Sequence, residues 1–394
     1  MVTKEEAGLQ PLERPCKKCN KQEATQISRT EPVCRDCFTQ YIYSKCVRQI
    51  GIVGKETQPP QGAPPIPRRY VLGLSLGTSS TVLLHIVNSY VDAILSKGRR
   101  SPFDLDVICI DTSISDYPNE QLQRTAETYR QHYPRLNVEV IPLTAVLGIP
   151  SIDWTSLPTL KQDAASPDQL RDLFSRLPSA TSRADILRLF TRHLLIHTAL
   201  ARGCQAVLFG HSTTTLGALT LAETAKGRGF SLPWQINDGV LPVGDFSSRD
   251  RDPTAATPTK QTIRVHYPLR EIYRKELDTY AALTDPPLAE IIPPEEAVDR
   301  AGSVVSHRDL SIDEVMVRYF ADVEENYPSI VANVVRTTAK LSRLDAEERC
   351  GVCGMTLDET GDERWKGEIG EGGGGGDGAG RSGLCYGCER SVHG

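Results

Sequence analysis

The chain has 394 residues, of which 39% are hydrophobic and 24% are charged, a balance typical of a globular protein with one large core and small accessory modules. The first residues are too charged for a secretory signal, and no segment approaches the roughly 18 apolar residues of a membrane helix, so we expect no membrane partner. The formal net charge of −5 gives no overall attraction to nucleic acid, so RNA binding would require a local basic patch.

Strand-like and helix-like patterns alternate through the middle of the chain. Short apolar runs predict strands at 70–75, 107–110, 138–141, 206–209 and 263–267. Apolar residues at helical spacing predict helices at 82–94, 119–132, 182–201, 215–225 and 269–283, and a pair at 311–344 that is broken near Pro328. Irregular or loop structure is expected at 150–180, 243–260 and 285–309. The alternation is typical of an α/β fold with a doubly wound parallel sheet covered by helices on both faces.

Composition divides the chain into five parts. We expect a basic, cysteine-bearing module at 1–54, a proline-rich linker at 55–69, a central α/β domain at 70–284, a loop with C-terminal helices at 285–345, and a second cysteine module at 346–394. The last part contains a glycine-rich tract at 370–380, which predicts a flexible insert between its cysteine pairs.

Eight of the eleven cysteines form Cys-x-x-Cys pairs, which are Cys16/Cys19, Cys34/Cys37, Cys350/Cys353 and Cys385/Cys388. Disulfide frameworks belong to short secreted chains, and nothing here predicts secretion, so reduced thiols are expected. Two pairs together supply the four thiolates of a tetrahedral zinc site with no open position. We therefore predict two structural zinc ions, one near each end; a redox role or coincidental spacing is the alternative. Cys46, Cys109 and Cys204 stand alone, and we expect the latter two to be buried.

The N-terminal cysteine module is basic. Its cationic side chains could contact RNA phosphates, with Tyr41 and Tyr43 nearby to stack on bases. The candidate contacts are Arg14, Lys17, Lys18, Lys21, Arg29 and Arg35. The alternative is a solvated charged surface with its aromatic rings packed on the module.

A short loop between the first central strand and its helix has the sequence Leu74-Ser75-Leu76-Gly77-Thr78-Ser79-Ser80. Free backbone N–H groups and the helix dipole attract phosphate at such a position. The loop resembles the pyrophosphate loop of N-type ATP pyrophosphatases, Ser-Gly-Gly-x-Asp-Ser, because it keeps Ser75, Gly77 and Ser80. It departs at Leu76, which replaces a glycine, and at Ser79, which replaces the aspartate that serves metal and nucleotide.

A second motif, Gly210-His211-Ser212-Thr213-Thr214-Thr215, follows the strand at 206–209. It resembles the Gly-His-Asn-x-Asp-Asp segment of tRNA thiolases, but Thr214 and Thr215 replace two aspartates, and neutral hydroxyls cannot hold magnesium as carboxylates do. Without those partners, His211 is predicted to be a packed or hydrogen-bonded remnant. Catalytic thiolases also place a Cys-x-x-Cys before the helix at 182–201, where this chain has Ser179-Ala180-Thr181-Ser182.

The chain is similar to the cytoplasmic tRNA 2-thiolation protein 2 family in its terminal cysteine pairs, its altered loop and second motif, Ala225–Gly229, and the helices at 311–344. The resemblance implies a non-catalytic subunit, without ATP turnover, that pairs with a catalytic tRNA thiolase in a cytosolic heterodimer. It implies 2-thiolation of wobble uridine (5-methoxycarbonylmethyl-2-thiouridine) in Lys, Gln and Glu tRNAs, with sulfur from a thiocarboxylated ubiquitin-related modifier, and a link to protein conjugation of that modifier. Two alternatives stay open: an active ATP-dependent tRNA thiolase with unusual ligands, and a zinc-stabilised RNA or protein adaptor.

Overall fold

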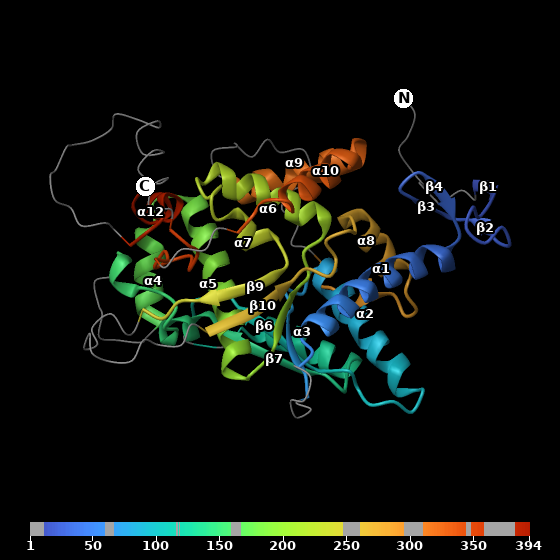
Figure 1. Ribbon diagram of the computed structural model, residues 1–394, viewed down its shortest axis with the longest axis horizontal. Helices are drawn as coiled ribbons and strands as arrows, with labels where there is room; N and C mark the ends of the chain where they lie inside the picture. The colour runs from blue at the N-terminus through green and yellow to red at the C-terminus, as the bar shows by residue number, and fades with distance from the viewer. Residues whose placement is uncertain are drawn as a thin grey trace.

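A six-stranded, mostly parallel sheet forms the centre of the molecule (Figure 1). In this computed structural model the described residues are 12–59, 67–115, 117, 119–158, 167–246, 261–294, 310–343, 348–357 and 383–394. The strand order is β7 (Asn137–Pro142), β6 (Asp104–Asp111), β5 (Arg69–Gly73), β8 (Ala206–Phe209), β10 (Gln261–His266) and β9 (Gly239–Val243). All neighbours are parallel except β9, an unpredicted edge strand that runs antiparallel to β10. The predicted doubly wound α/β fold is confirmed.

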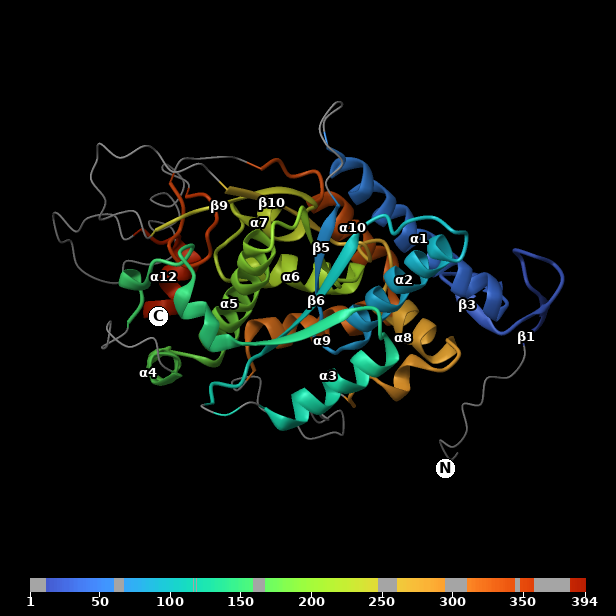
Figure 2. The ribbon, with the colours of Figure 1, turned by 90° about the horizontal axis from the view of Figure 1, so that it is seen from below.

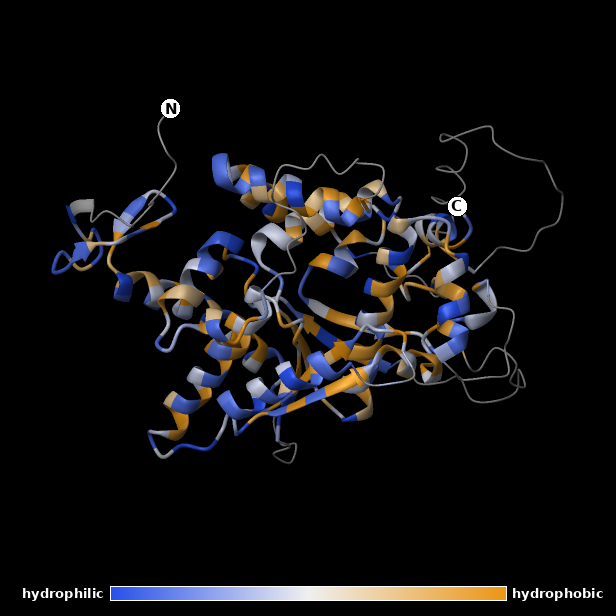
Figure 3. Ribbon diagram, turned by 180° about the vertical axis from the view of Figure 1, so that it is seen from behind, coloured by the Kyte–Doolittle hydropathy of each residue, from blue (hydrophilic) through white to orange (hydrophobic). Residues whose placement is uncertain are grey.

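The strands alternate their side chains between two hydrophobic cores, one on each face of the sheet. Val71, Ile108 and Val207 belong to the first core, whereas Tyr70 and Leu72 belong to the second. Figure 2 shows the helices that cover them: on the first lie α5 (Ala180–Ala201) and α6 (Thr213–Ala225), and on the second lie α1 (Arg35–Glu56), α2 (Thr78–Leu95), α3 (Glu120–His132) and α8 (Arg274–Leu283). Because both faces are buried, the strands are largely apolar, as their colour in Figure 3 shows.

The 22-residue helix α1, which is missing from the predicted elements, begins directly after Cys34. Its buried residues recur every three or four positions and belong to the second core: Phe38, Ile42, Cys46, Ile50 and Val53. The helical period is therefore present in the sequence, inside a segment dominated by its cysteine pairs. Before α1, two small antiparallel pairs carry the first cysteines: β1 (Leu12–Pro15) with β2 (Glu23–Ala24), and β3 (Gln26–Ser28) with β4 (Glu31–Val33).

Two C-terminal helices pack against the outer side of α6. They are α9 (Ile312–Asn326) and α10 (Pro328–Thr338), which meet at Pro328 and confirm the predicted break. Phe320 and Val331 of these helices join Ala218 of α6 in a third, smaller core. The remaining short elements are α4 (Pro167–Arg176), α7 (Leu232–Ile236), α12 (Tyr386–His393), η1 (Leu143–Gly148), η2 (Trp154–Ser156) and η3 (Leu288–Glu290).

The predicted start of the helix that becomes α8 is wrong. The helix predicted at 269–283 begins only at Arg274, because the preceding residues form turns. The Glu276 carboxylate accepts a hydrogen bond from the Tyr273 backbone N–H at 3.0 Å, and this contact fixes the start of the helix.

Three segments predicted as irregular can be compared only in part. Within 150–180 the structure contains α4, which is anchored by the buried Leu170 and Leu173. Most of 243–260 and 285–309, and the whole glycine-rich tract at 370–380, lie outside the described residues. No helix in the described ranges has both the length and the apolar character that a bilayer crossing needs.

Candidate functional site

The first four-cysteine group lies at the N-terminal end of α1. The Sγ atoms of Cys16, Cys19, Cys34 and Cys37 all lie within 4.8 Å of one another. Cys34 precedes α1 and Cys37 lies in its first turn, so the start of the helix positions the second pair. The Sγ atoms of Cys19 and Cys34 are 3.8 Å apart. A tetrahedral zinc ion with bonds of about 2.3 Å requires sulfur atoms about 3.8 Å apart, so the geometry fits.

The second four-cysteine group lies at the opposite end of the molecule, beside α12 (Figure 1). The Sγ atoms of Cys350, Cys353, Cys385 and Cys388 lie within 4.8 Å of one another, and all four residues are buried. The Cys353 and Cys385 Sγ atoms are 3.9 Å apart. These residues belong to the first core. The structure thus assembles both predicted cysteine groups, and either could hold a metal ion.

A buried ionic network joins the second cysteine group to α5. The side chains of Asp185 and Arg228 are fully buried and form an ion pair. An Arg228 Nη atom also lies 3.5 Å from the Cys388 Sγ atom, and the Ser391 hydroxyl of α12 donates to Asp185 at 2.7 Å. Burial alone would raise the pKa of the Asp185 carboxyl, but the neighbouring cations, Arg228 above all, hold it well below its usual value. The carboxylate therefore stays ionised inside the protein.

The same network extends to α9 and leaves no spare room. Lys226 Nζ lies 2.9 Å from a carboxylate oxygen of Asp185 and 2.9 Å from one of Asp313. A Cβ atom on Gly387 would lie 2.5 Å from Arg228 Cγ and 2.6 Å from the Lys226 carbonyl oxygen. Only glycine at this position lets α12 approach the network so closely.

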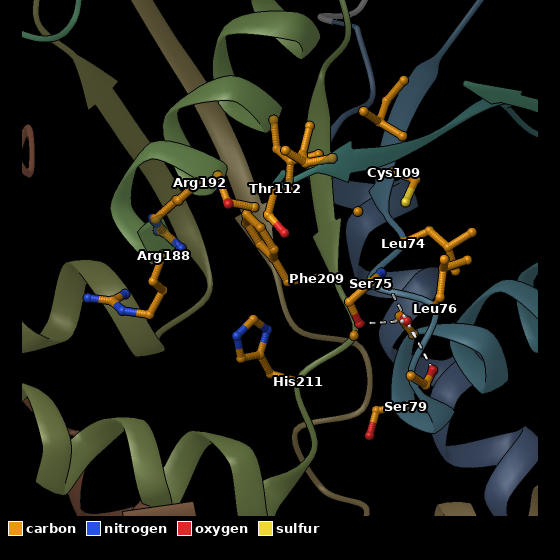
Figure 4. A pocket seen from close by; sticks show the side chains of 18 of the residues that line it. Leu74, Ser75, Leu76, Ser79, Cys109, Thr112, Arg188, Arg192, Phe209 and His211 are labelled. Carbon is orange, nitrogen blue, oxygen red and sulfur yellow. Dashed lines mark hydrogen bonds between the residues drawn. The ribbon is translucent and has the colours of Figure 1, made fainter. Parts of the chain in front are cut away.

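A cavity of about 690 Å³ opens at the carboxyl ends of β5, β6 and β8 (Figure 4). The strand order reverses between β5 and β8, and open α/β sheets bind ligands at such a point. The loop at 74–80 and the start of α2 form one wall, and α5 forms the opposite wall. Much of the lining is apolar and includes Leu74, Ile108, Ile110, Leu122, Leu187 and Leu195.

The loop at 74–80 is closed by its own hydrogen bonds. The Ser80 hydroxyl lies 3.2 Å from the Ser75 backbone N and 3.0 Å from the Ser75 hydroxyl, and it donates to the Gly77 carbonyl at 3.1 Å. Leu76 has a φ of 62°, in the left-handed region that favours glycine. The loop therefore keeps a conformation suited to glycine although a leucine occupies the position. The Ser79 hydroxyl is buried and has no hydrogen-bond partner among the described residues.

The second predicted motif meets this loop. A Cβ atom on Gly210 would lie 2.7 Å from Ser80 Cα, so glycine is needed where the end of β8 touches the start of α2. Thr215 lines the cavity, but Thr214 does not. The Thr214 hydroxyl instead donates to Glu324 of α9 and accepts from the Arg274 backbone N–H at 3.0 Å. Thr214 therefore ties α6 to α8 and α9.

Two arginines on α5, which no sequence motif indicated, line the opposite wall beside His211 (Figure 4). Arg192 donates to the Tyr267 hydroxyl at 2.9 Å and to the Trp234 carbonyl at 3.1 Å. Arg188 lies one turn earlier on the same helix. The available sequence signal is an arginine pair four residues apart among the apolar residues of this helix.

His211 packs between aromatic rings at the end of β8. Its ring centroid lies 5.7 Å from that of Phe209 and 5.3 Å from that of Tyr267. Burial, assisted by the positive charges of Arg192 and Arg188, lowers the pKa of His211 to about 3. The imidazole is therefore neutral at physiological pH, and its Nδ1 atom has no hydrogen-bond partner in the described part of the chain.

Among the described residues that line the cavity, Asp111 carries the one carboxylate. Its oxygens accept hydrogen bonds from the backbone N–H of Ser113 at 3.0 Å and of Asn119 at 3.2 Å. Both oxygens of this carboxylate are thus engaged in holding the segment that follows β6.

The isolated cysteines are buried and inert. Burial, with Asp111 adding to it, raises the pKa of the Cys109 thiol to about 12, and burial raises that of Cys204 to about 11. Where catalytic thiolases carry a Cys-x-x-Cys, the Ser179 hydroxyl accepts from the Ser182 backbone N–H at 3.0 Å. This segment therefore serves as the N-terminal cap of α5.

The predicted RNA-contact residues divide into two groups. Four are exposed on the first cysteine module, whose ribbon is mostly blue (hydrophilic) in Figure 3: Arg14, Lys17, Lys18 and Lys21. The other two are engaged with the segment around α8. Arg29 donates to the Glu271 carbonyl at 3.1 Å, and Arg35 donates to the Leu283 carbonyl at 2.9 Å. These two arginines hold the module against the central sheet domain.

Comparison with known proteins assigns a family to this arrangement. Residues 311–373 match a family model described as cytoplasmic tRNA 2-thiolation protein 2. A curated relative of that name from Phaeosphaeria nodorum is 36% identical over 96% of this chain and 94% of its own length. The chain belongs to the cytoplasmic tRNA 2-thiolation protein 2 family. A second member, from Pyrenophora tritici-repentis, is 34% identical over the same shares of the two chains, 96% and 94%.

A solved structure supports the fold of this family member. The U34-tRNA thiolase NcsA from Methanococcus maripaludis, determined with its 4Fe-4S cluster, superposes with a TM-score of 0.52 at 15% identity. The match covers 87% of this chain and 97% of the thiolase. The family and the thiolase-like fold predicted from the sequence motifs are both confirmed.

Proposed function

We propose that this chain is the non-catalytic subunit of a cytoplasmic tRNA thiolation complex. Its partner would be a catalytic thiolase subunit, and the product would be 2-thiolated wobble uridine in Lys, Gln and Glu tRNAs. The names of the relatives, which refer to cytoplasmic tRNA 2-thiolation, support the pathway. In this proposal the sulfur comes from a thiocarboxylated ubiquitin-related modifier, and the complex is also linked to protein conjugation of that modifier.

The single observation that carries the non-catalytic role is the carboxylate content of the cavity wall. Asp111 is engaged by backbone N–H groups, and the positions where thiolase motifs place aspartates hold Ser79, Thr214 and Thr215. Activation of ATP requires carboxylates that hold magnesium against the phosphates. The described wall offers guanidinium groups instead, so the cavity is poorly suited to hold magnesium-bound ATP.

The two cysteine groups would hold structural zinc. The ligands would be Cys16, Cys19, Cys34 and Cys37 at one end and Cys350, Cys353, Cys385 and Cys388 at the other. Bound zinc would supply a tetrahedral crosslink, and in each group the four donors leave no position for a substrate. The first group would fix the basic module before α1, and the second would fix α12 against α5.

The proposal is tested by separating the two subunits. We expect the purified chain alone to hydrolyse no ATP above background in the presence of tRNA and magnesium. We expect wobble-uridine thiolation only when a catalytic subunit with intact loop aspartate and central cysteines is added. Hydrolysis of ATP by the isolated chain that depends on tRNA would overturn the non-catalytic role. Full thiolation by the catalytic subunit without this chain would overturn its place in the complex.

The basic N-terminal module is proposed to contact tRNA through its exposed cations. We expect replacement of Lys17, Lys18 and Lys21 by glutamine to weaken tRNA binding by the complex. The slope of log affinity against log salt should fall by about 2 to 3, because each lost phosphate contact removes about 0.7 to 0.9. The matched control removes three exposed cations elsewhere, Lys97, Arg99 and Arg100, and should leave the slope unchanged. If the two triple variants give equal salt slopes, the cations of the module do not contact tRNA and form only a solvated surface.

A further inference from the structure

Arg192 is a buried cation without a counter-charge. The residue is 8% exposed, and its two Nη atoms donate to neutral oxygens, the hydroxyl of Tyr267 and the carbonyl of Trp234. No carboxylate of the described residues forms an ion pair with it. An isolated charge is costly to bury, so buried cations are normally paired. The neighbouring Arg188 is the contrast, since Asp185 and Glu223 balance its charge.

Polar atoms without partners surround the same cavity. The Nε atoms of Arg188 and Arg192, the Nδ1 atom of His211 and the hydroxyl of Ser79 are all buried and lack hydrogen-bond partners in the described part of the chain. All four residues line the cavity, three of them on the side of α5 (Figure 4). Buried polar atoms in folded proteins are rarely left unpaired, so a cluster of them in residues that line one cavity indicates a missing hydrogen-bonding ligand.

We propose that the cavity binds a phosphate ester whose anionic group is held at the α5 wall by Arg192. A phosphoryl group offers several acceptor oxygens and a negative charge, which match the unpaired donors and the unpaired cation. At about 690 Å³ the cavity is far larger than a bare phosphate, and its apolar lining suits an organic group of nucleoside size.

The anion site lies at the α5 wall, opposite the loop where the sequence motif predicts phosphate, so the Ser79 hydroxyl of that loop is not part of it. In that loop the hydroxyls of Ser75 and Ser80 bond to each other, and Ser80 also occupies the Ser75 backbone N–H. The carboxylate of Asp111 is engaged by backbone groups as well. Arg192 therefore takes the part that a divalent cation plays in other phosphate sites, and binding needs no added metal. The inference rests on the cavity alone and stands or falls independently of the thiolation role.

The test is equilibrium binding to the full chain by calorimetry in the presence of EDTA. The three probes are a nucleoside monophosphate, the corresponding neutral nucleoside and inorganic phosphate. We expect the monophosphate to bind at least tenfold more tightly than either of the others, and EDTA to leave its affinity unchanged. Arg192→Gln should lose at least tenfold in affinity for the monophosphate and little for the nucleoside. The matched control is Arg183→Gln, an exposed arginine on the same helix, which should bind as the wild type does.

Several results would overturn the inference. They are equal affinity for the nucleoside and its monophosphate, undiminished binding by Arg192→Gln, loss of binding on adding EDTA, and no binding of any probe at millimolar concentration. If inorganic phosphate binds as tightly as the monophosphate, the cavity is a simple anion site, and the proposal that it binds a phosphate ester is wrong. If Arg192→Gln does not fold, Arg192→Lys replaces it, because lysine keeps the charge without the planar fork. We expect Arg192→Lys to keep the preference for the monophosphate over the nucleoside, and loss of that preference in a folded protein would count against the inference.

Discussion

Replacement of Arg228 is the clearest test of whether the buried ionic network stabilises the fold. Its fully buried guanidinium pairs with Asp185, lies 3.5 Å from a carboxylate oxygen of Glu223, and lies 3.5 Å from the Cys388 sulfur. Arg228→Met keeps an unbranched apolar stem like that of the arginine but removes its charge and all of its donors. The substitution therefore tests the ionic contacts rather than the packing.

The expected loss follows from the charges that remain. The network has three cations and three carboxylates, namely Arg188, Lys226, Arg228, Asp185, Glu223 and Asp313. After the substitution two cations face three carboxylates in the interior, beside a cysteine group that is itself negative when ionised. Removing one partner of a buried ion pair costs about 3 to 5 kcal/mol. Because Asp185 keeps contacts with Lys226 and the Ser391 hydroxyl, we expect the lower end, about 3 kcal/mol.

The assay is urea unfolding followed by circular dichroism, with metal content measured on the same samples. Arg228→Met should lower the free energy of unfolding by about 3 kcal/mol and lose metal from the second cysteine group at lower chelator concentration than the wild type. The matched control is Arg124→Met, which breaks an ion pair with Glu120 whose side chains are 82% and 84% exposed. That change should cost less than about 1 kcal/mol. A loss below about 1 kcal/mol for Arg228→Met, with unchanged metal retention, would refute the reasoning.

Two further predictions concern close packing and pH. Gly210→Ala places a Cβ atom 2.7 Å from the Ser80 backbone and should cost about 1 to 3 kcal/mol, whereas Gly51→Ala in α1 meets no atom within 4 Å and should stabilise by about 0.5 to 1 kcal/mol. Thermal unfolding should show opposite shifts in melting temperature for the two variants, and equal shifts would contradict this prediction. Burial lowers the pKa of His211 to about 3 and that of His193 to about 4, so the unfolded chain takes up protons on these residues at higher pH than the folded one. Stability should therefore fall as pH drops from about 6.5 toward 4, by up to about 1.4 kcal/mol per pH unit for each residue, and urea unfolding of His211→Asn at several pH values should show a shallower fall.

Local patterns explain why much of the fold could be predicted. Strands such as 206–209 are buried on both faces and therefore form short apolar runs, and the order of strands and helices specifies a parallel sheet. The cysteine pairs are equally local, because a Cys-x-x-Cys spacing already places two ligands on one metal. The missed α1 shows the limit of this approach. The helical spacing of its buried residues is present in the sequence at Phe38, Ile42 and Cys46, but the same segment also carries the cysteine pairs, which predict a different structure.

The residues that shape the site were hidden because their partners are distant in sequence. Thr214 meets Glu324 across 110 positions, and Arg228 meets Cys388 across 160. The unpaired charge of Arg192 can be recognised only once the packing around it is known. Motif comparison therefore identified the aspartates that are replaced in this chain, whereas the structure identified the groups that line the cavity.

Helix α1 also determines where the basic module can reach. At 1.5 Å per residue its 22 residues span about 33 Å, and the helix packs on the second core from Phe38 to Val53. Arg29 donates to Glu271 before α8 and Arg35 donates to Leu283 at its end, so the module has a fixed heading as well as a fixed distance from the sheet. Each residue inserted between Cys37 and Phe38, before the packed part of the helix, would turn the heading by about 100°, while seven would nearly restore it and move the module about 10 Å farther out. Reach and heading could thus be varied separately, and the effect of each on the proposed RNA contact could be measured.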